Sequence, residues 1–293
     1  MRLIAGLALV VVTALSSPGG AHAAGGTIAI VAAENVYGDI ARQIGGDRVS
    51  VSSIMSNPDA DPHLFETTPA VGRSLATAQI VVFNGVGYDP WMAKLLKAAP
   101  HSGRVEIVAA DLVHKTSGDN PHLWYDPPTM PAVATALAGA LGKADAGHAA
   151  DYQARLRTFI ASLDAIHDKI AAIRKKYAGK PVTATEPVFG YMVDALGLTM
   201  RNGSFQLAVM NNTEPSAKDM AAFEDDLKHH KVAVLFYNKQ VTGKLTQRLL
   251  EIARQARVPV VGVTETEPAN TSFQDWMLGQ LGDTEKALAA PSP

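Results

Sequence analysis

The chain has 293 residues, which suggests about two domains of roughly 100–200 residues each. Hydrophobic residues make up 47% and charged residues 18%, a composition that supports a large buried core and argues against intrinsic disorder. The formal net charge of −2 excludes a broad electrostatic binder of nucleic acid, and the absence of cysteine excludes disulfides, thiolate metal sites and a lipidated N-terminal cysteine.

The first 23 residues have the pattern of a signal peptide. Arg2 is followed by an apolar run over 3–15, a Ser-Ser-Pro-Gly-Gly break and the small-x-small sequence Ala21-His22-Ala23. The run is shorter than the roughly 20 apolar residues that a membrane span needs, so an N-terminal anchor helix is the weaker alternative. We therefore expect cleavage near Ala23 and an exported, periplasmic protein.

Short apolar runs alternate with helical patterns along the rest of the chain. The runs expected to form strands are 27–33, 49–55, 79–85, 105–110, 181–186, 232–237 and 258–264. Near-continuous apolar runs are typical of strands buried on both faces, as in parallel sheets. Stretches such as 88–98 and 216–230 are expected to be helices. The alternation predicts two α/β lobes, over 24–145 and 180–293, each a mainly parallel sheet flanked by helices.

One long helical segment separates the two predicted lobes. Over 149–177 apolar residues recur at spacings of three and four, which places one apolar stripe against a core. At 1.5 Å per residue the segment is roughly 40 Å long. Gly179-Lys180-Pro181 ends it, and no second helix of that length is predicted to pair with it. We expect 146–179 to be a rigid backbone helix that joins the lobes.

Four side chains that can bind a metal follow the predicted strands. Open α/β sheets bind ligands beyond the carboxyl ends of their strands. His63 and His122 lie there in proline-bounded loops of the first half, and Glu186 and Glu265 directly follow strands of the second half. Two neutral imidazoles and two carboxylates would neutralise a divalent transition ion and could form a closed tetrahedral zinc site.

Each of these residues also has an ordinary explanation. A single histidine is more often a surface or core residue than a ligand, and Asn-Pro and Asp-Pro sequences form turns. Glu186 could cap the following helix, and Glu265 could be solvated. Spacing alone therefore leaves the four-ligand site and a set of unrelated polar residues both open.

At these positions the chain resembles the zinc/manganese, cluster A-type, solute-binding proteins of bacterial ABC importers. The resemblance covers essentially the whole mature chain. It rests on four segments in order and spacing: Asp61-Pro-His63-Leu-Phe-Glu66, Asn84-Gly-Val-Gly-Tyr-Asp-Pro-Trp91, Asn120-Pro-His122-Leu-Trp-Tyr-Asp126 and Thr185-Glu186-Pro-Val-Phe-Gly-Tyr191. It implies two α/β lobes joined by a long helix, with the metal between them.

The resemblance also implies a ligand set. His63 and His122 match the family's two histidines, and Glu186 stands where zinc members typically have histidine and manganese members glutamate. The fourth ligand is usually aspartate, and here Glu265 replaces it, with Glu267 as a rival. The His/Asp-rich loop of zinc members is absent between 114 and 120. Carboxylates favour Mn²⁺ or Fe²⁺, whereas the Irving–Williams order favours Zn²⁺, so the ion stays open.

The function implied is capture of Zn²⁺ or Mn²⁺ and delivery to a membrane ABC permease, by a monomer that catalyses no reaction and binds no nucleic acid. Asp61, Glu66 and Asp126 are candidates to orient the two histidines. Two alternatives remain. An exported metallohydrolase would need an open coordination position for water and a free general base. A metal-chelate binding protein would need an aromatic or basic cleft, whereas Trp91, Trp124 and Trp276 are more simply core residues.

Overall fold

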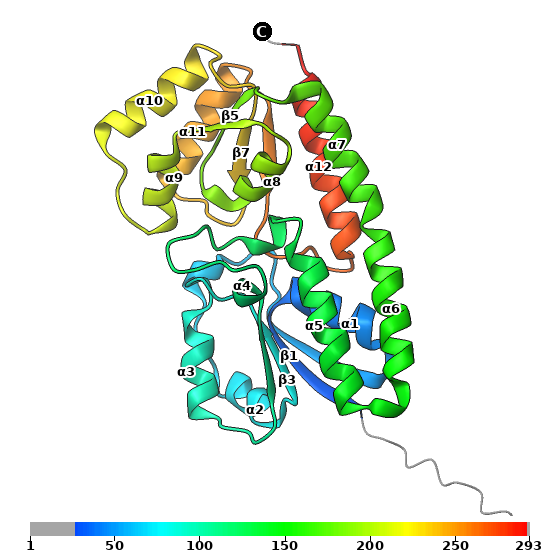
Figure 1. The fold of residues 1–293 in the computed structure, drawn as a ribbon. Helices are drawn as coiled ribbons and strands as arrows, with labels where there is room; N and C mark the ends of the chain where they lie inside the picture. Colours follow the sequence, from blue (N-terminus) through cyan, green and yellow to red (C-terminus); the bar gives the residue numbers. More distant parts are fainter. Residues whose placement is uncertain (1–26, 292–293) are drawn as a thin grey trace, which may run out of the picture.

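A computed structural model describes residues 27–291, except for the side chain of His63. The predicted signal peptide over 1–23 lies outside these residues. Within the described range, no helix combines the length and the apolar character needed to cross a membrane. The chain forms two lobes, one above the other in Figure 1, with a column of helices along the right-hand side of both.

The N-terminal lobe is built on a four-stranded parallel sheet in the order β2-β1-β3-β4. The strands are β1 (Ile28–Glu34), β2 (Val49–Met55), β3 (Ile80–Phe83) and β4 (Val105–Val108), and the helices are α1 (Asn35–Gly45), α2 (Pro69–Thr77), α3 (Pro90–Ala98), α4 (Ala109–Leu112) and α5 (Thr129–Ala144). Alternate residues of β1 face opposite cores. Ile30 packs on the side of α1 and α5, and Val31 packs on the side of α2 and α3. Because both faces are covered, these strands are almost continuously apolar.

The C-terminal lobe repeats this plan with a parallel sheet in the order β6-β5-β7-β8. The strands are β5 (Pro181–Ala184), β6 (Thr199–Arg201), β7 (Leu235–Asn238) and β8 (Val260–Val263), and the helices are α8 (Gly190–Ala195), α9 (Gly203–Met210), α10 (Ala217–Lys228), α11 (Lys244–Gln255) and α12 (Phe273–Ala289). Strand β6 is absent from the sequence prediction. It is a three-residue edge strand with no fully buried residue, so it carries no apolar run.

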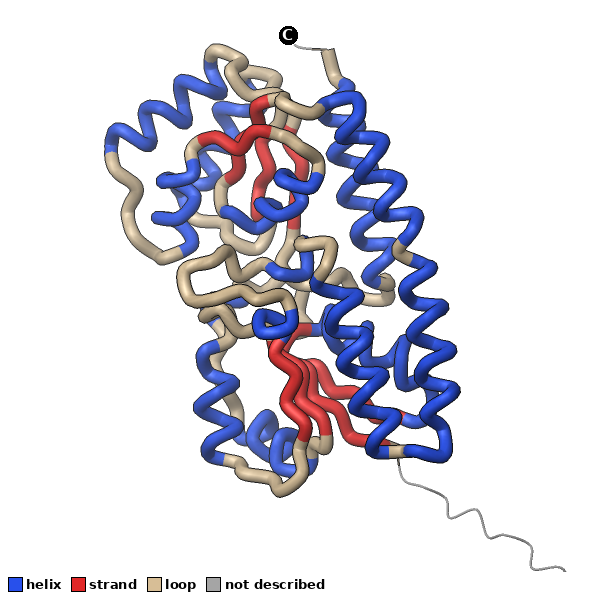
Figure 2. Tube along the Cα trace, in the orientation of Figure 1, coloured by secondary structure: helices blue, strands red, loops and turns tan. Residues whose placement is uncertain are grey.

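The connecting segment is helical over its expected length, as α6 (Ala149–Ser162) and α7 (Asp164–Tyr177). Leu163 between them keeps right-handed helical dihedrals, so the segment follows one path along both lobes (Figures 1 and 2). Among the described residues no second helix of that length pairs with it, but two shorter helices together cover it. The 16-residue α5 packs against α6, and the 17-residue α12 packs against α7. The two lobes thus share a layer of paired helices.

Aromatic side chains join the cores of the two lobes. The ring of Tyr125, from the N-terminal lobe, lies 4.9 Å from that of Phe189 and 5.5 Å from that of Trp276, both from the C-terminal lobe. Trp124 and Trp276 are buried, as the sequence analysis expects of core residues. Packed interiors resist deformation, so this continuous core limits how far the lobes can separate.

Candidate metal centre

Three of the four predicted ligands meet where the lobes face each other. Glu186 follows β5 and Glu265 follows β8 at the carboxyl ends of the C-terminal sheet, while His122 precedes a short turn of the N-terminal lobe. All three are at most 2% exposed. Nε2 of His122 lies 3.3 Å from Oε2 of Glu265. His63 lies in the helical turn Pro62–Leu64, after β2.

Together these groups supply part of a coordination shell. Among the described side chains, which do not include that of His63, no three histidine or acidic groups already stand in an arrangement that could hold a metal ion. The structure thus brings His122, Glu186 and Glu265 into one buried cluster and leaves the fourth predicted ligand untested.

The side chain of Asn120 fixes the orientation of His122. Its Nδ2 donates to the carbonyl of Pro187 at 2.7 Å, which turns its Oδ1 towards Nδ1 of His122, also at 2.7 Å. Nδ1 is therefore the donor in this pair, and Nε2 is the ring nitrogen that faces the Glu265 carboxylate. Among the described side chains, that buried Nε2 has no hydrogen-bond partner. This is the arrangement of a metal-binding histidine with an oriented ring.

Asn238, the last residue of β7, connects the two carboxylates. Its Nδ2 donates to Oε2 of Glu186 at 2.5 Å and to Oε1 of Glu265 at 2.7 Å. Oε1 of Glu186 is buried and has no hydrogen-bond partner within the described part of the chain. Burial, together with the charge of Glu265, raises the pKa of Glu186 to about 8. Two such carboxylates in a buried site favour a bound cation, which would offset their repulsion and desolvation.

Tyr88 contributes from the other lobe. Its hydroxyl donates to Oε2 of Glu265 at 2.9 Å, and its ring packs edge-on against Trp124. Burial, followed by the charge of Glu265, raises the pKa of the Tyr88 phenol well above its usual value. Tyr88 therefore remains a neutral donor to the carboxylate.

Glu267, the rival fourth ligand, occupies a different environment. The side chain of Asn35 clamps its peptide, donating to the Glu267 carbonyl at 2.7 Å and accepting from its N–H at 3.1 Å. Its carboxyl borders a polar cavity whose lining also includes Arg42 and Ser53. Burial, followed by the charge of Asp39, raises the pKa of Glu267 to about 9. None of these neighbours belongs to the cluster around His122.

Three carboxylates, those of Asp61, Glu66 and Asp126, are predicted to orient the histidines. Asp126 faces Lys115 at 3.8 Å, and Asn120 is the residue that orients His122. The charge of Asp61 acts on Glu186, whose pKa it helps to raise, and Glu66 is exposed. Sequence reasoning missed the neutral residues Asn120 and Asn238. Asn120 lies in a segment that carries the family resemblance, and Asn238 lies at the end of a strand.

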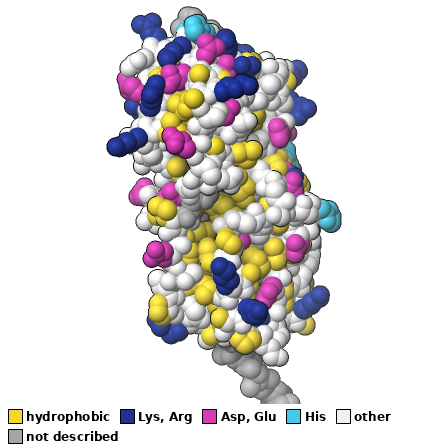
Figure 3. Space-filling view, turned by 90° about the vertical axis from the view of Figure 1, so that its left-hand side faces the viewer, with side chains coloured by type: hydrophobic (Ala, Val, Ile, Leu, Met, Phe, Trp, Pro, Cys, Tyr) yellow, Lys and Arg dark blue, Asp and Glu magenta, His cyan; other side chains and the backbone are white. Residues whose placement is uncertain are grey.

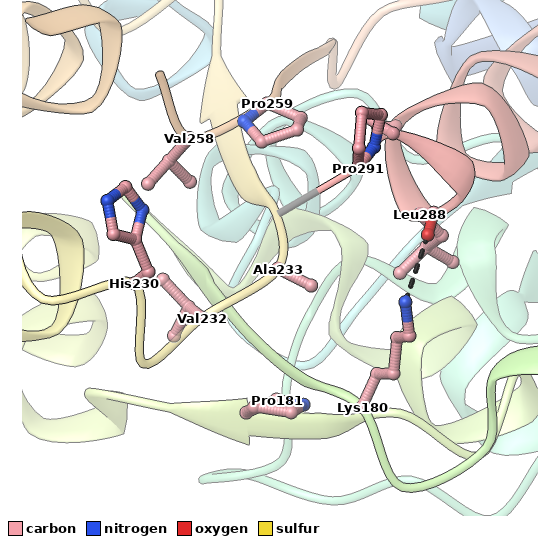
Figure 4. A pocket seen from close by; sticks show the side chains of 11 residues that line it. Lys180, Pro181, His230, Val232, Ala233, Val258, Pro259, Leu288 and Pro291 are labelled. Carbon is pink, nitrogen blue, oxygen red and sulfur yellow. Dashed lines mark hydrogen bonds between the residues drawn. The ribbon is translucent and has the colours of Figure 1, made fainter. Parts of the chain in front are cut away.

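The surface cavity shown in Figure 4 is separate from this cluster. It has a volume of about 190 Å³ and lies beside Lys180 and Pro181 at the start of β5 and beside Pro259, which precedes β8. Lys180 Nζ donates to the carbonyl of Leu288 in α12. These are the amino ends of the strands, whereas Glu186 and Glu265 follow the carboxyl ends. The candidate site is therefore the buried cluster between the lobes.

Comparisons with known proteins identify the family. The model of the family described as "Zinc-uptake complex component A periplasmic" (ZnuA) matches residues 30–287. The chain belongs to this family. It is therefore an exported solute-binding protein of a metal ABC importer, which works with a membrane permease, and not an enzyme. The metallohydrolase alternative is thereby excluded.

Relatives of the chain carry names of the same kind. A "Putative metal-binding protein" of Treponema pallidum is 26% identical, covering 89% of this chain and 87% of the relative. The "Manganese ABC transporter substrate-binding lipoprotein PsaA" of Streptococcus mitis is 22% identical, over 97% of this chain and 96% of the relative. Among solved structures, the periplasmic zinc binding protein TroA from Treponema pallidum has a TM-score of 0.76 at 20% identity, over 90% of this chain and 100% of that one. The last likeness shows the same two-lobed fold.

Proposed function

We propose that this protein captures a divalent transition metal ion, Zn²⁺ or Mn²⁺, between its lobes in the periplasm, after cleavage near Ala23. The ligands are His63 and His122 from the N-terminal lobe and Glu186 and Glu265 from the C-terminal lobe. The observation that carries the proposal is the pair of buried, unsatisfied acceptors, Nε2 of His122 and Oε1 of Glu186, in one cluster with Glu265. Relatives named for zinc and for manganese support the ion class.

Delivery follows from the division of the ligands between the lobes. Each lobe supplies half of the shell, so the complete site exists only while both are in place. Docking of the monomeric protein on its ABC permease releases the ion by separating the lobes or displacing one ligand. Hydrophobic side chains gather near mid-height on the face shown in Figure 3, close to where the lobes meet. This apolar surface could contact a partner.

Metal analysis after stripping and reloading tests the proposal. The protein should bind one ion per chain, and zero binding of free ions would leave only the chelate alternative. A ligand at a thousandfold excess over its Kd stabilises a protein by about 4 kcal/mol, so the melting temperature should rise clearly. His63→Ala and His122→Ala should lose this rise. The exposed His101 provides the control, and His101→Ala should retain it.

A further inference from the structure

Asn238 has a fixed orientation in the cluster of acidic groups. It is 1% exposed, and its backbone N–H donates to Oγ1 of Thr185 at 3.1 Å. Its Oδ1 accepts the backbone N–H of Gln240 at 3.0 Å. Because a backbone donor holds Oδ1, the amide cannot be flipped without losing that bond, and only Nδ2 can face the carboxylates. Its two hydrogens then serve Glu186 and Glu265, one each.

This single amide group occupies one oxygen of each carboxylate. Glu186 keeps Oε1, which has no partner, and Glu265 keeps Oε2, which accepts from Tyr88 and lies beside Nε2 of His122. The amide N–H competes with bidentate binding by each carboxylate and so favours binding through the other oxygen, and Oε2 of Glu265 has a second lone pair besides the one that accepts from Tyr88. With two imidazole nitrogens, the proposed ligand set then supplies four donor atoms.

The number of donors matters for the choice of ion. Zn²⁺ in closed protein sites is almost always four-coordinate and tetrahedral. Mn²⁺ is typical of octahedral, oxygen-rich sites, so it benefits when carboxylates bind through both oxygens. An amide that withholds one oxygen from each of two carboxylates therefore acts against Mn²⁺ more than against Zn²⁺.

We propose that Asn238 is a specificity-determining residue, which favours Zn²⁺ over Mn²⁺ by restricting Glu186 and Glu265 to one oxygen each. The inference rests on the proposed function, because it assumes that these carboxylates bind the ion. It concerns a residue that touches the ligands and not the ion itself.

The side chain of Gln240 also holds the loop that carries Glu265. Its Oε1 accepts from the backbone N–H groups of Glu265 and Thr266, and its Nε2 donates to the carbonyl of Ala60, in the loop before His63. These bonds hold the backbone of Glu265 through the Gln240 side chain, whereas Oδ1 of Asn238 holds the Gln240 N–H. Truncating Asn238 frees the carboxylates and removes the acceptor of that N–H, but it leaves the bonds from the Gln240 side chain to Glu265, Thr266 and Ala60 in place.

The test compares Asn238→Ala and Asn238→Ser with the unchanged protein. Kd values for Zn²⁺ and Mn²⁺ are measured by competition with a chromogenic chelator, and X-ray absorption gives the coordination number of each ion. Loss of a group that orients a ligand typically weakens metal binding about 10–100-fold, and we expect this loss for Zn²⁺. Mn²⁺ should lose much less and gain carboxylate oxygens, so the Zn²⁺/Mn²⁺ affinity ratio should fall at least about tenfold. The serine variant, which keeps one donor, should fall between.

The control is Gln206→Ala, which removes another buried amide of the same lobe, one that donates to the carbonyl of Arg201. It should leave the affinity ratio unchanged. Equal losses for both ions in the Asn238 variants, or unchanged coordination numbers, would overturn the inference. If the alanine variant does not fold, the serine variant decides. Failure of the unchanged protein to bind either ion would instead overturn the proposed function.

Discussion

The hydroxyl of Tyr88 donates to Oε2 of Glu265, a hydrogen bond of 2.9 Å that crosses from one lobe to the other. Tyr88 follows Gly85, Val86 and Gly87, all of which have positive φ angles. The Asp89 carboxylate holds this turn by accepting from the N–H groups of Asn84 and Gly85. A left-handed conformation is costly for a β-branched residue such as Val86, so the turn depends on these bonds. The Asn-Gly-Val-Gly-Tyr-Asp sequence thus positions a donor at the metal centre.

Tyr88→Phe should weaken metal binding. The variant keeps the ring but loses the donor that fixes the Glu265 carboxylate, a change that typically costs about tenfold or more in affinity. Chelator competition with Zn²⁺ measures the change in Kd. Tyr177→Phe, on the connecting helix, is the control and should bind as the unchanged protein does. Equal affinity in all three proteins would show that Tyr88 does not orient Glu265.

Glu265 and Glu267 should respond differently to loss of charge. Glu265→Gln removes a carboxylate from the cluster with Glu186 and His122, so metal affinity should fall by at least about 100-fold, as expected for a lost ligand. Glu267→Gln alters a group beside Asn35 and Arg42 and should leave affinity unchanged. The same competition assay distinguishes them. If only the Glu267 variant lost metal affinity, Glu267 and not Glu265 would be the fourth ligand.

Much of the fold could be predicted because burial on both faces leaves a simple signal. Strands β1 and β3 are nearly continuous apolar runs, and the connecting helix carries an apolar stripe. Strand β6 left no such signal, because Thr199–Arg201 lies at a sheet edge. The packing of α12 on α7 was missed since it joins segments about a hundred residues apart, which sequence periodicity cannot pair.

The site could be predicted only where it uses residues that bind metals. Searching the carboxyl ends of strands found His122, Glu186 and Glu265, but it passed over Asn238, which is the last residue of β7. A neutral amide is not a typical ligand, and its role appears only when its two acceptors are seen together. The sequence also could not show which of Glu265 and Glu267 faces the metal centre. Side chains alternate between the two faces only within a strand, and both residues lie in the loop after β8, where Asn35 holds the Glu267 peptide.

Glu34 should make the stability of the metal-free protein depend on pH. Burial, followed by the charge of Asp89, raises the pKa of Glu34 well above its usual value. The Glu34 carboxyl interacts with the side chain of Asp89, so it stays protonated and can donate to that carboxylate. Above about pH 4.5 the unfolded chain releases this proton while the folded protein keeps it. The free energy of unfolding should therefore fall by about 1.4 kcal/mol per pH unit until the folded-state pKa is reached.

Glu34→Gln tests this expectation, because the amide keeps a donor for Asp89 and cannot ionise. Urea unfolding of the metal-free proteins between about pH 5 and pH 9 should show a shallower decline for the variant. Glu251→Gln, at an exposed position of α11, should decline as the unchanged protein does. Parallel curves for Glu34→Gln and the unchanged protein would mean that Glu34 ionises normally in the folded state.

Metal binding should move the lobes by only a few Å, in contrast to wide hinge closure. Opening the cleft would break buried bonds between the lobes, among them Tyr125 to the carbonyl of Thr264 and Gln240 to that of Ala60. It would also expose the aromatic contacts of Tyr125, and the paired helices α5–α6 and α7–α12 resist bending along the whole molecule.

The absence of cysteine makes this motion measurable by spin labelling at two introduced sites. Lys97→Cys on α3 and Lys218→Cys on α10 place one label on the exposed surface of each lobe. Pulsed electron paramagnetic resonance should give nearly the same distance distribution before and after Zn²⁺ is added, with a narrower width in the loaded form because the ligands then span both lobes. A pair within one lobe, Lys97→Cys with Lys143→Cys, reports changes unrelated to lobe movement. A shift of the interlobe distance by about 10 Å or more would show a hinge, and the paired helices would then have to bend near Leu163.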